Sequence, residues 1–205
     1  MKPLIRLTAK AAPLMRENID TDAIIPSREM RSVSKSGLAD GLFAGWRYKN
    51  IRSREPDPDF VLNQKAYEGA EILVAGQNFG CGSSREHAVW ALAEYGFRAI
   101  IAPSFAPIFR SNCIRNGIAP IALDSADVEA LALLARQGET FEIDLEAMEV
   151  RAGDHTLPFD LEAEARTMLM EALDLIELTR KSMDEIKQFR SEHSQSRPWL
   201  YFQAS

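Results

Sequence analysis

The fold is decided by the stretch Glu71-Ile72-Leu73-Val74-Ala75-Gly76-Gln77-Asn78-Phe79-Gly80-Cys81-Gly82-Ser83-Ser84-Arg85-Glu86-His87. Its first five residues form a short apolar run that ends at a glycine, which is typical of a buried strand. A glycine-rich loop follows. From about residue 84 to residue 95, apolar side chains recur at helical spacing, and Gly96 suits the position just after a helix end. The stretch therefore predicts a strand, a glycine-rich loop and a helix in succession.

The same alternation continues downstream of this unit. Residues 98–102 and 118–123 are apolar and predict two further strands. A helix is expected over 104–116, with Ser104 as its cap and Gly117 as its stop. Another is expected from Asp124 or Ser125 to Gln137, closed by Gly138. Strands that alternate with helices favour an α/β fold, in which helices pack on a sheet.

The flanking segments are less regular. Residues 4–10 predict a strand, and residues 27–60 predict a mostly irregular loop with a short helix near 37–43. A loop of that length in a compact domain is often functional. Three further segments complete the prediction: a β-hairpin or meander over 140–159, one or two helices over 161–193, and a weakly ordered tail over 194–205.

The composition excludes several classes of function. The formal net charge is −6, from 24 basic and 30 acidic residues, which argues against general binding to nucleic acid or to anionic membranes. The two cysteines, Cys81 and Cys113, and three scattered histidines are too few to hold an iron–sulfur cluster or a structural zinc site alone. Any metal is thus expected from another chain. Without a signal-like start or a run of about 18 apolar residues, we expect a cytoplasmic protein.

The loop from Gly80 to His87 is the candidate site for chemistry. Glycines let the backbone approach a ligand, and free N–H groups at a helix start attract anions. Arg85, expected in the first helical turn, adds a forked donor that matches a carboxylate. A structural interpretation remains open from the residues alone. Ser83 and Glu86 have the spacing of a helix capping box, in which each satisfies the other's backbone N–H.

The segment from Asn78 to Ala88 resembles the signature of the swivelling domain of the aconitase family. More closely, it is similar to the small subunits of bacterial isopropylmalate isomerases, also called 3-isopropylmalate dehydratases. A second similar segment is Asn18-Ile19-Asp20-Thr21-Asp22-Ala23-Ile24-Ile25-Pro26, and a third runs from Ser104 to Ile121. The resemblance covers roughly residues 4–125. Val89 departs from it, because the family usually has proline there.

The resemblance implies a fold, a cofactor and a partner. The fold is an α/β swivelling β/β/α domain of the aconitase type over 1–160, with a C-terminal helical extension over 161–205. The cofactor is a [4Fe–4S] cluster bound by a partner large subunit and not by this chain. The substrate is a small dicarboxylate, and activity requires the large subunit.

The resemblance also implies roles for particular residues. Ser83 corresponds to the serine that removes a proton from carbon, Arg85 to the arginine that grips a substrate carboxylate, and Ser84 to a neighbouring hydrogen-bonding group. Asp22 corresponds to an active-site aspartate that interacts with the other catalytic groups rather than with a metal. A second carboxylate-binding arginine is assigned to Arg28, with Arg31 as the alternative.

Other functions remain as alternatives. A related hydro-lyase acting on homoaconitate, citramalate or dimethylmalate would keep the mechanism and change the side chain of the substrate. Met30 and Val33 in the loop after Pro26 suit an isopropyl group, but one methylene discriminates by only about 1–3 kcal/mol. A non-catalytic anion-binding module is a second alternative. A nucleotide-binding domain is disfavoured because Arg85 stands where Gly-x-Gly-x-x-Gly requires its last glycine.

Overall fold

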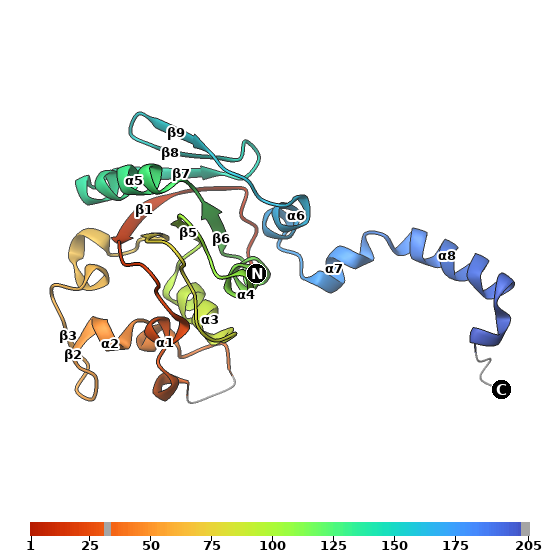
Figure 1. Cartoon of the computed structure of the whole chain (residues 1–205), viewed down its shortest axis with the longest axis horizontal. Helices are drawn as coiled ribbons and strands as arrows, with labels where there is room; N and C mark the ends of the chain where they lie inside the picture. The colour runs from red at the N-terminus through yellow and green to blue at the C-terminus, as the bar shows by residue number, and fades with distance from the viewer. Residues whose placement is uncertain (31–33, 202–205) are drawn as a thin grey trace. The chain divides into compact units, whose positions relative to one another are not determined.

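The computed structural model describes residues 1–30 and 34–201 (Figure 1). The chain forms two compact units, Met1–Ala172 and Leu173–Ser205. Helix α6 (Ala163–Glu171) falls in the first unit. The division predicted from the sequence, into a swivelling domain over 1–160 and a C-terminal helical extension over 161–205, stays a prediction.

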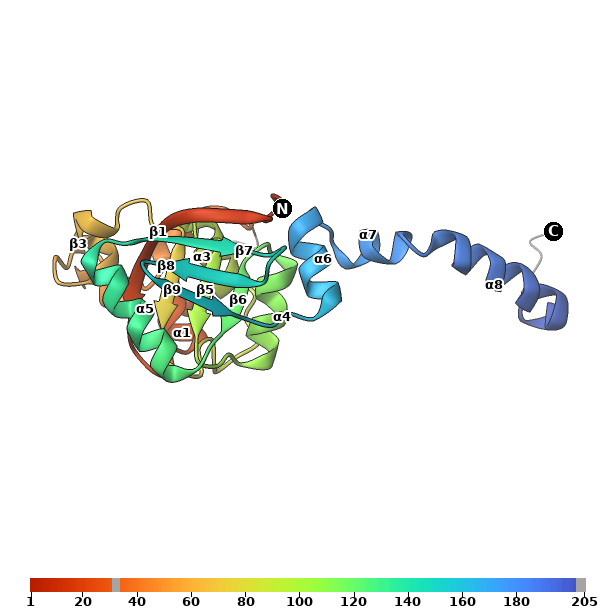
Figure 2. The same cartoon turned by 90° about the horizontal axis from the view of Figure 1, so that it is seen from above.

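A seven-stranded mixed sheet organises the first unit, in the order β6-β5-β4-β1-β7-β8-β9. The parallel strands are β1 (Arg6–Leu14), β4 (Ile72–Ala75), β5 (Ala99–Ala102) and β6 (Ala119–Ala122). The antiparallel strands are β7 (Thr140–Asp144), β8 (Glu149–Ala152) and β9 (His155–Pro158), which lie side by side in Figure 2. The predicted α/β class and the meander over 140–159 are confirmed.

Strand β1 joins the two halves of this sheet. Residues 6–10 pair antiparallel with β7, and residues 11–14 pair parallel with β4. Pro13 lies beyond the residues that pair with β7, so its missing N–H interrupts no bond to that strand. The strand predicted over 4–10 is therefore longer than expected, and its second half supports the parallel sheet.

Helices cover both faces of the parallel strands, which explains why β4 and β5 are buried along their whole length. Helices α3 (His87–Tyr95) and α4 (Pro107–Arg115) share one core cluster with the alternate strand residues Leu73, Ala75, Ile100 and Ala102. Helix α5 (Ser125–Gln137) packs on the strands through its buried residues Val128, Leu131, Ala132 and Ala135. Figure 1 shows α3 and α5 on opposite sides of β5.

Two helices begin later than the sequence predicts. Helix α3 begins at His87 rather than at residue 84, and α4 begins at Pro107 rather than at residue 104. Ser104 does not cap α4, because its hydroxyl accepts the backbone N–H of Asn78 at 2.8 Å. Helix α5 has the predicted bounds, and Gly138 closes it in the left-handed conformation with φ of 83°.

The long connection between β1 and β4 consists of short elements. The described part of this connection contains two short helices, α1 (Thr21–Ile24) and α2 (Ala44–Arg47). Two 3₁₀ turns, η1 (Ser27–Glu29) and η2 (Ala39–Gly41), lie between them, and two more, η3 (Val61–Asn63) and η4 (Lys65–Tyr67), precede β4. A two-stranded sheet, β2 (Tyr48–Asn50) with β3 (Glu55–Pro56), was not predicted. The helix expected near 37–43 is only the turn η2.

The C-terminal unit contains α7 (Leu175–Arg180), α8 (Met183–Ser196) and the turn η5 (Pro198–Leu200). Together with α6 this makes three helices in the described part of the region predicted as one or two. Part of the predicted weakly ordered tail is helical, and His193 Nδ1 lies 2.9 Å from the hydroxyl of Tyr201. In the described residues, no helix has the length and apolar character needed to cross a membrane.

Candidate functional site

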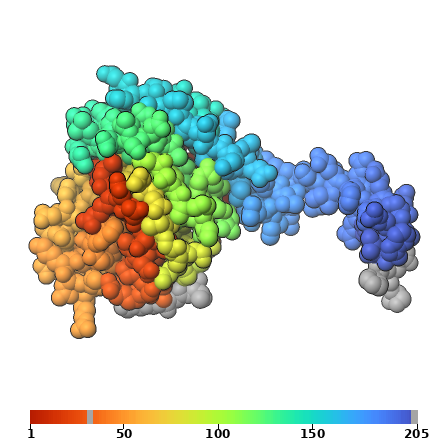
Figure 3. Space-filling model, in the orientation of Figure 1, coloured from red at the N-terminus to blue at the C-terminus, as the bar shows by residue number. Residues whose placement is uncertain are grey.

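Two segments far apart in the sequence meet to form the candidate site. The segment that enters α1 lies against the glycine-rich loop after β4, and Figure 3 shows the yellow loop beside the red N-terminal segment. Backbone hydrogen bonds join Gly80 N–H to Ile19 C=O at 2.7 Å and Thr21 N–H to Cys81 C=O at 2.9 Å. The predicted Asn18–Pro26 and Asn78–Ala88 segments are therefore direct neighbours.

Close packing explains the glycines of this loop. Gly80 has φ of 76°, and a Cβ atom there would lie 2.0 Å from Cγ of the Phe109 ring on α4. Gly82 has φ of 92° and faces Asp20 and Thr21, whose nearest atoms would lie 3.4 Å from an added Cβ. Both positions adopt the left-handed region that favours glycine, and Gly80 also leaves no room for a side chain. The loop is thereby held against α4 and α1.

Ser83 is bound to Thr21 rather than to a helix end. Thr21 is only 1% exposed. Its hydroxyl accepts Ser83 N–H and donates to Ser83 C=O, both at 3.2 Å. The Ser83 hydroxyl lies 3.4 Å from the same Thr21 oxygen. The Ser83 side chain is itself exposed. Thr21 therefore fixes the backbone that carries the candidate base.

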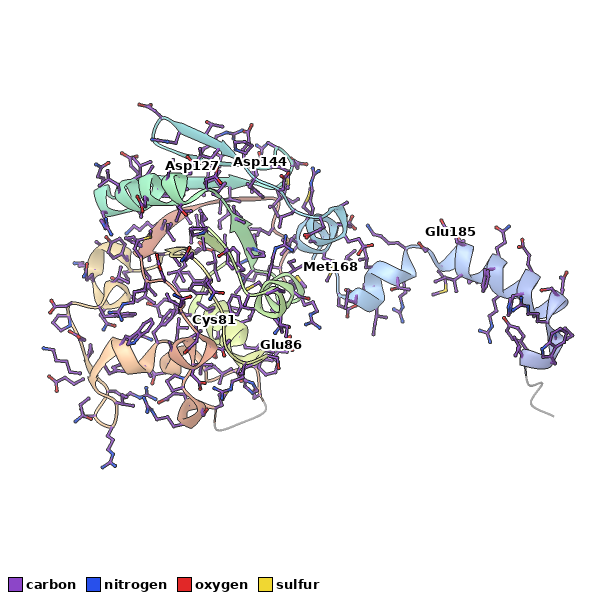
Figure 4. The ribbon with its side chains drawn as sticks, viewed as in Figure 1. Cys81, Glu86, Asp127, Asp144, Met168 and Glu185 are labelled. Carbon is purple, nitrogen blue, oxygen red and sulfur yellow. The ribbon has the colours of Figure 1, made fainter. Side chains whose placement is uncertain are left out.

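The capping-box interpretation of Ser83 and Glu86 is wrong. Glu86 itself precedes α3, and no side-chain cap hydrogen bond forms there. The Glu86 carboxylate, labelled in Figure 4, instead accepts a side-chain N–H of Asn116, the residue just after α4, at 2.7 Å. Arg85 accordingly lies ahead of the helix and not in its first turn, which corrects its expected placement.

Asp22 and Arg85 form an ion pair across the two segments. The side chains are 57% and 29% exposed, so solvent and a ligand can reach both. Ser27 donates its hydroxyl to the same Asp22 oxygen at 3.3 Å. Ser83, Arg85 and Asp22 thus meet at one place, and exposed Ser84 lies between the first two in the chain.

Arg28 lies just outside this group. It is in the turn η1, its side chain is 55% exposed, and its Nε is 3.6 Å from the buried carboxylate of Glu29. Met30 packs partly buried against the main core cluster. The alternative arginine, Arg31, and the candidate contact Val33 lie outside the described residues.

Comparisons with known proteins identify the family of the chain. The model of the aconitase C-terminal domain family matches residues 1–126. A 3-isopropylmalate dehydratase small subunit from Cupriavidus necator is 53% identical over 98% of this chain and 99% of its own length. The chain belongs to the family of 3-isopropylmalate dehydratase small subunits.

Further members of this small-subunit family agree in length and fold. The small subunit from Neisseria gonorrhoeae is 46% identical, covering 98% of this chain and 99% of its own. The crystal structure of a 3-isopropylmalate dehydratase from Methanocaldococcus jannaschii matches with a TM-score of 0.66 at 31% identity, over 91% of this chain and 99% of that one. The resemblance seen in the sequence is confirmed.

The cysteines of this small-subunit family member do not suit an iron–sulfur cluster. Cys113 is completely buried in the core, and burial raises the pKa of its thiol well above the usual range. Cys81 is partly buried, and its backbone pairs with the Asp20–Thr21 segment. Among residues 1–30 and 34–201, no group of three or more His, Cys, Asp or Glu side chains could hold a metal ion.

The sequence did not predict that Thr21 and Ser27 contact the candidate site residues Ser83 and Asp22. Thr21 lies between Asp20 and Asp22 in a segment already singled out for its resemblance, which was the available signal. Asp20 has a local role, because its carboxylate caps α1 by accepting Ala23 N–H at 2.6 Å. Ser27 gave no such signal, since its hydrogen bond to Asp22 depends on how the chain turns at Pro26.

Proposed function

We propose that the chain is the small subunit of a two-chain hydro-lyase that interconverts 2-isopropylmalate and 3-isopropylmalate through isopropylmaleate, a step of leucine biosynthesis. The observation that carries this proposal is the 53% identity to a named small subunit over nearly the full length of both chains. The meeting of Asp22, Ser83 and Arg85 supports it. The complex is expected to be cytoplasmic.

The proposed partner is a large subunit that carries the [4Fe–4S] cluster. The two cysteines of the full sequence, fewer than an iron–sulfur cluster needs, support this division. The contribution of this chain is then to bind the substrate carboxylates and to move a proton, and the steps below concern its own residues.

In this proposal Arg85 binds a carboxylate of the substrate. The guanidinium exchanges its contact with Asp22 for the incoming carboxylate, and Asp22 keeps its hydrogen bond from Ser27. The proton that leaves is on a carbon next to a carboxylate, whose negative charge rises as the proton is removed. Arg85 therefore interacts more strongly with the transition state than with the bound substrate, as catalysis requires.

Ser83 is proposed as the base that takes this proton. A serine hydroxyl is a weak acid, so its alkoxide needs strong local stabilisation. The charge of Arg85 two residues away is suited to supply it once a partner closes the site to water. The Thr21 hydroxyl, 3.4 Å from Ser83 Oγ, adds to this by turning its single hydrogen from Ser83 C=O to the alkoxide. Ser84 adds hydrogen bonds to the substrate, and Arg28 contributes to binding the second carboxylate.

The experiment that tests the proposal is hydration of isopropylmaleate under anaerobic conditions. Three samples are compared: this chain alone, a cluster-loaded large subunit alone, and the two mixed. Activity in the mixture alone is expected. Citraconate and a homoaconitate analogue, assayed beside isopropylmaleate, test the choice of alkyl group. Absence of turnover in the mixture, with binding of a small dicarboxylate by this chain alone, would contradict the proposal and favour an anion-binding module.

A further inference from the structure

Glu94 makes an unusual set of contacts outside the site. It lies on α3, and its carboxylate accepts three consecutive backbone N–H groups, from Gly37 at 2.6 Å, Leu38 at 2.5 Å and Ala39 at 2.9 Å. Burial of the Glu94 carboxyl raises its pKa, but these three donors outweigh that effect and lower the pKa overall. Gly37 has φ of 83°, a conformation that helps successive N–H groups converge on one anion.

The segment held by Glu94 packs directly against the turn that carries Arg28. Gly41, at the end of η2, lies so close to that turn that an added Cβ would be 2.7 Å from Cβ of Glu29 and 3.2 Å from Cδ1 of Ile25. The position of η2 therefore fixes the position of Glu29. The Glu29 carboxylate pairs in turn with Arg28 and, on its other side, with Arg54.

The turn η1, which carries Arg28 and Glu29, also contacts the candidate site through its first residue, Ser27. Ser27 donates to Asp22, which is paired with Arg85. The turn Ser27–Glu29 thus lies between the Asp22–Arg85 pair and the segment anchored by Glu94. A continuous set of contacts runs from Glu94 through Gly41 and Glu29 to Arg28.

We propose that Glu94 is a positioning residue for substrate binding, which holds the η2 segment so that Glu29 presents Arg28 to the second carboxylate of an alkylmalate. The inference rests on the proposed function, since it needs a dicarboxylate substrate. Glu94 itself touches no reacting atom. Its loss lets Arg28 move away from its binding position and leaves Ser83 and Arg85 in place.

The test measures KM and kcat of the assembled two-chain enzyme with Glu94→Ala and Glu94→Gln. A binding contact that is equally strong in the bound substrate and the transition state affects KM alone. Glu94→Ala is therefore expected to raise KM about five- to tenfold, equivalent to about one ordinary hydrogen bond, with kcat within twofold. Glu94→Gln keeps one acceptor oxygen and is expected to fall between Glu94→Ala and the parent. Glu129→Gln, an exposed glutamate on α5, is the matched control and should leave both constants unchanged.

A double-mutant cycle with Arg28→Lys separates positioning from general damage. If Glu94 acts through Arg28, Glu94→Ala raises KM much less in the Arg28→Lys background than in the parent. Additive effects, a fall in kcat without a change in KM, or an unchanged KM in Arg28→Lys alone would each overturn the inference. Failure of the parent complex to hydrate isopropylmaleate would instead contradict the proposed function, so the two failures are distinct.

Discussion

Ser83 and Thr21 are 62 residues apart in the sequence, yet the Thr21 hydroxyl reaches the N–H, the C=O and the hydroxyl of Ser83. The arrangement holds the backbone of an exposed serine rigid while its side chain stays free to meet a substrate. Rigid support of this kind is what a catalytic group needs, because small errors in its position reduce the rate strongly.

Ser83→Ala is expected to lower kcat about 100- to 10,000-fold, the usual contribution of a positioned acid–base group. Assembly with the large subunit should be unchanged, since the exposed side chain packs against little else. Steady-state kinetics and gel filtration of the mixed subunits measure the two quantities. Ser84→Ala is the neighbouring comparison and should lose much less activity. A Ser83→Ala enzyme with near-parent kcat would remove Ser83 from the mechanism.

Thr21→Val removes the hydroxyl and leaves Ser83 N–H and C=O without their partner. An unsatisfied buried polar group costs about 1–3 kcal/mol, but these two groups are only partly buried. We therefore expect a loss of about 1 kcal/mol in the free energy of unfolding in urea, and a lower kcat. Thr21→Ser keeps the hydroxyl and should retain most of both. Equal behaviour of the two variants would show that the hydroxyl is not what holds Ser83.

At the scale of elements, the loop between β4 and α3 depends on its contact with the Phe109 ring. Gly80→Ala is expected to destabilise the fold more than Gly138→Ala does. Both residues have φ near 80°, but Gly138 has open space around it. The left-handed conformation costs about 1–2 kcal/mol at either position. Overpacking against Phe109 adds about 1–3 kcal/mol at Gly80 alone. Equal losses in urea unfolding would contradict the packing argument.

Asp144 supports the junction of β7 with β1. Its carboxylate accepts N–H groups of Ala147 and Glu146 and pairs with Arg6 at 2.8 Å (Figure 4 labels Asp144). The N–H of Ala147 is the largest influence that lowers the pKa of this buried carboxyl, and burial opposes it.

Because the pKa of Asp144 is lower in the folded state, its stabilisation is present above the unfolded value of about 3.9 and is lost as pH falls through the folded value. Asp144→Asn is therefore expected to destabilise the chain at pH 7 and to differ progressively less from the parent below about pH 4. Urea unfolding across this range measures it, with Asp154→Asn in the β8–β9 turn as the exposed control. A difference that does not shrink in acid would exclude the ionised carboxylate as the cause.

The alternation of strands and helices from β4 to α5 was predictable, because apolar runs, helical spacing and closing glycines are local signals. The starts of α3 and α4 were not. Ser83 and Ser104 both look like caps in the sequence, but each is bound by a distant segment, through Thr21 and Asn78 respectively. For the same reason, Asp22, Ser83 and Arg85 could be grouped from the sequence only through a family resemblance. The hydrogen bonds from residues 37–39 to Glu94 gave no local signal either.

At the scale of the whole molecule, the core lies within the first unit. The last buried apolar residue in the described chain is Leu169 on α6, whereas Ile176 on α7 and Phe189 on α8 are exposed. Leu169 also accepts the backbone N–H of Leu4 at 2.9 Å, which ties α6 to the N-terminus.

A chain ending at Ala172 is therefore expected to unfold cooperatively with a Tm within about 4 °C of the full chain, a shift equivalent to about 1 kcal/mol. A chain ending at Asp160 removes the buried Met168 and Leu169 and should unfold at a much lower temperature. Thermal unfolding of both chains checks this. Similar Tm values for the two would place the boundary of the stable unit nearer residue 160.

Strand β1 also has a consequence for how the chain is made. It leaves the ribosome before both of its sheet partners, β4 and β7, and β7 ends only at Asp144. Residues 11–14 can pair once β4 has been made, but residues 6–10 stay unpaired until β7 follows. Such long-range pairing slows folding and leaves strand edges open to aggregation. The risk of aggregation is therefore highest before β7 is made and pairs with β1.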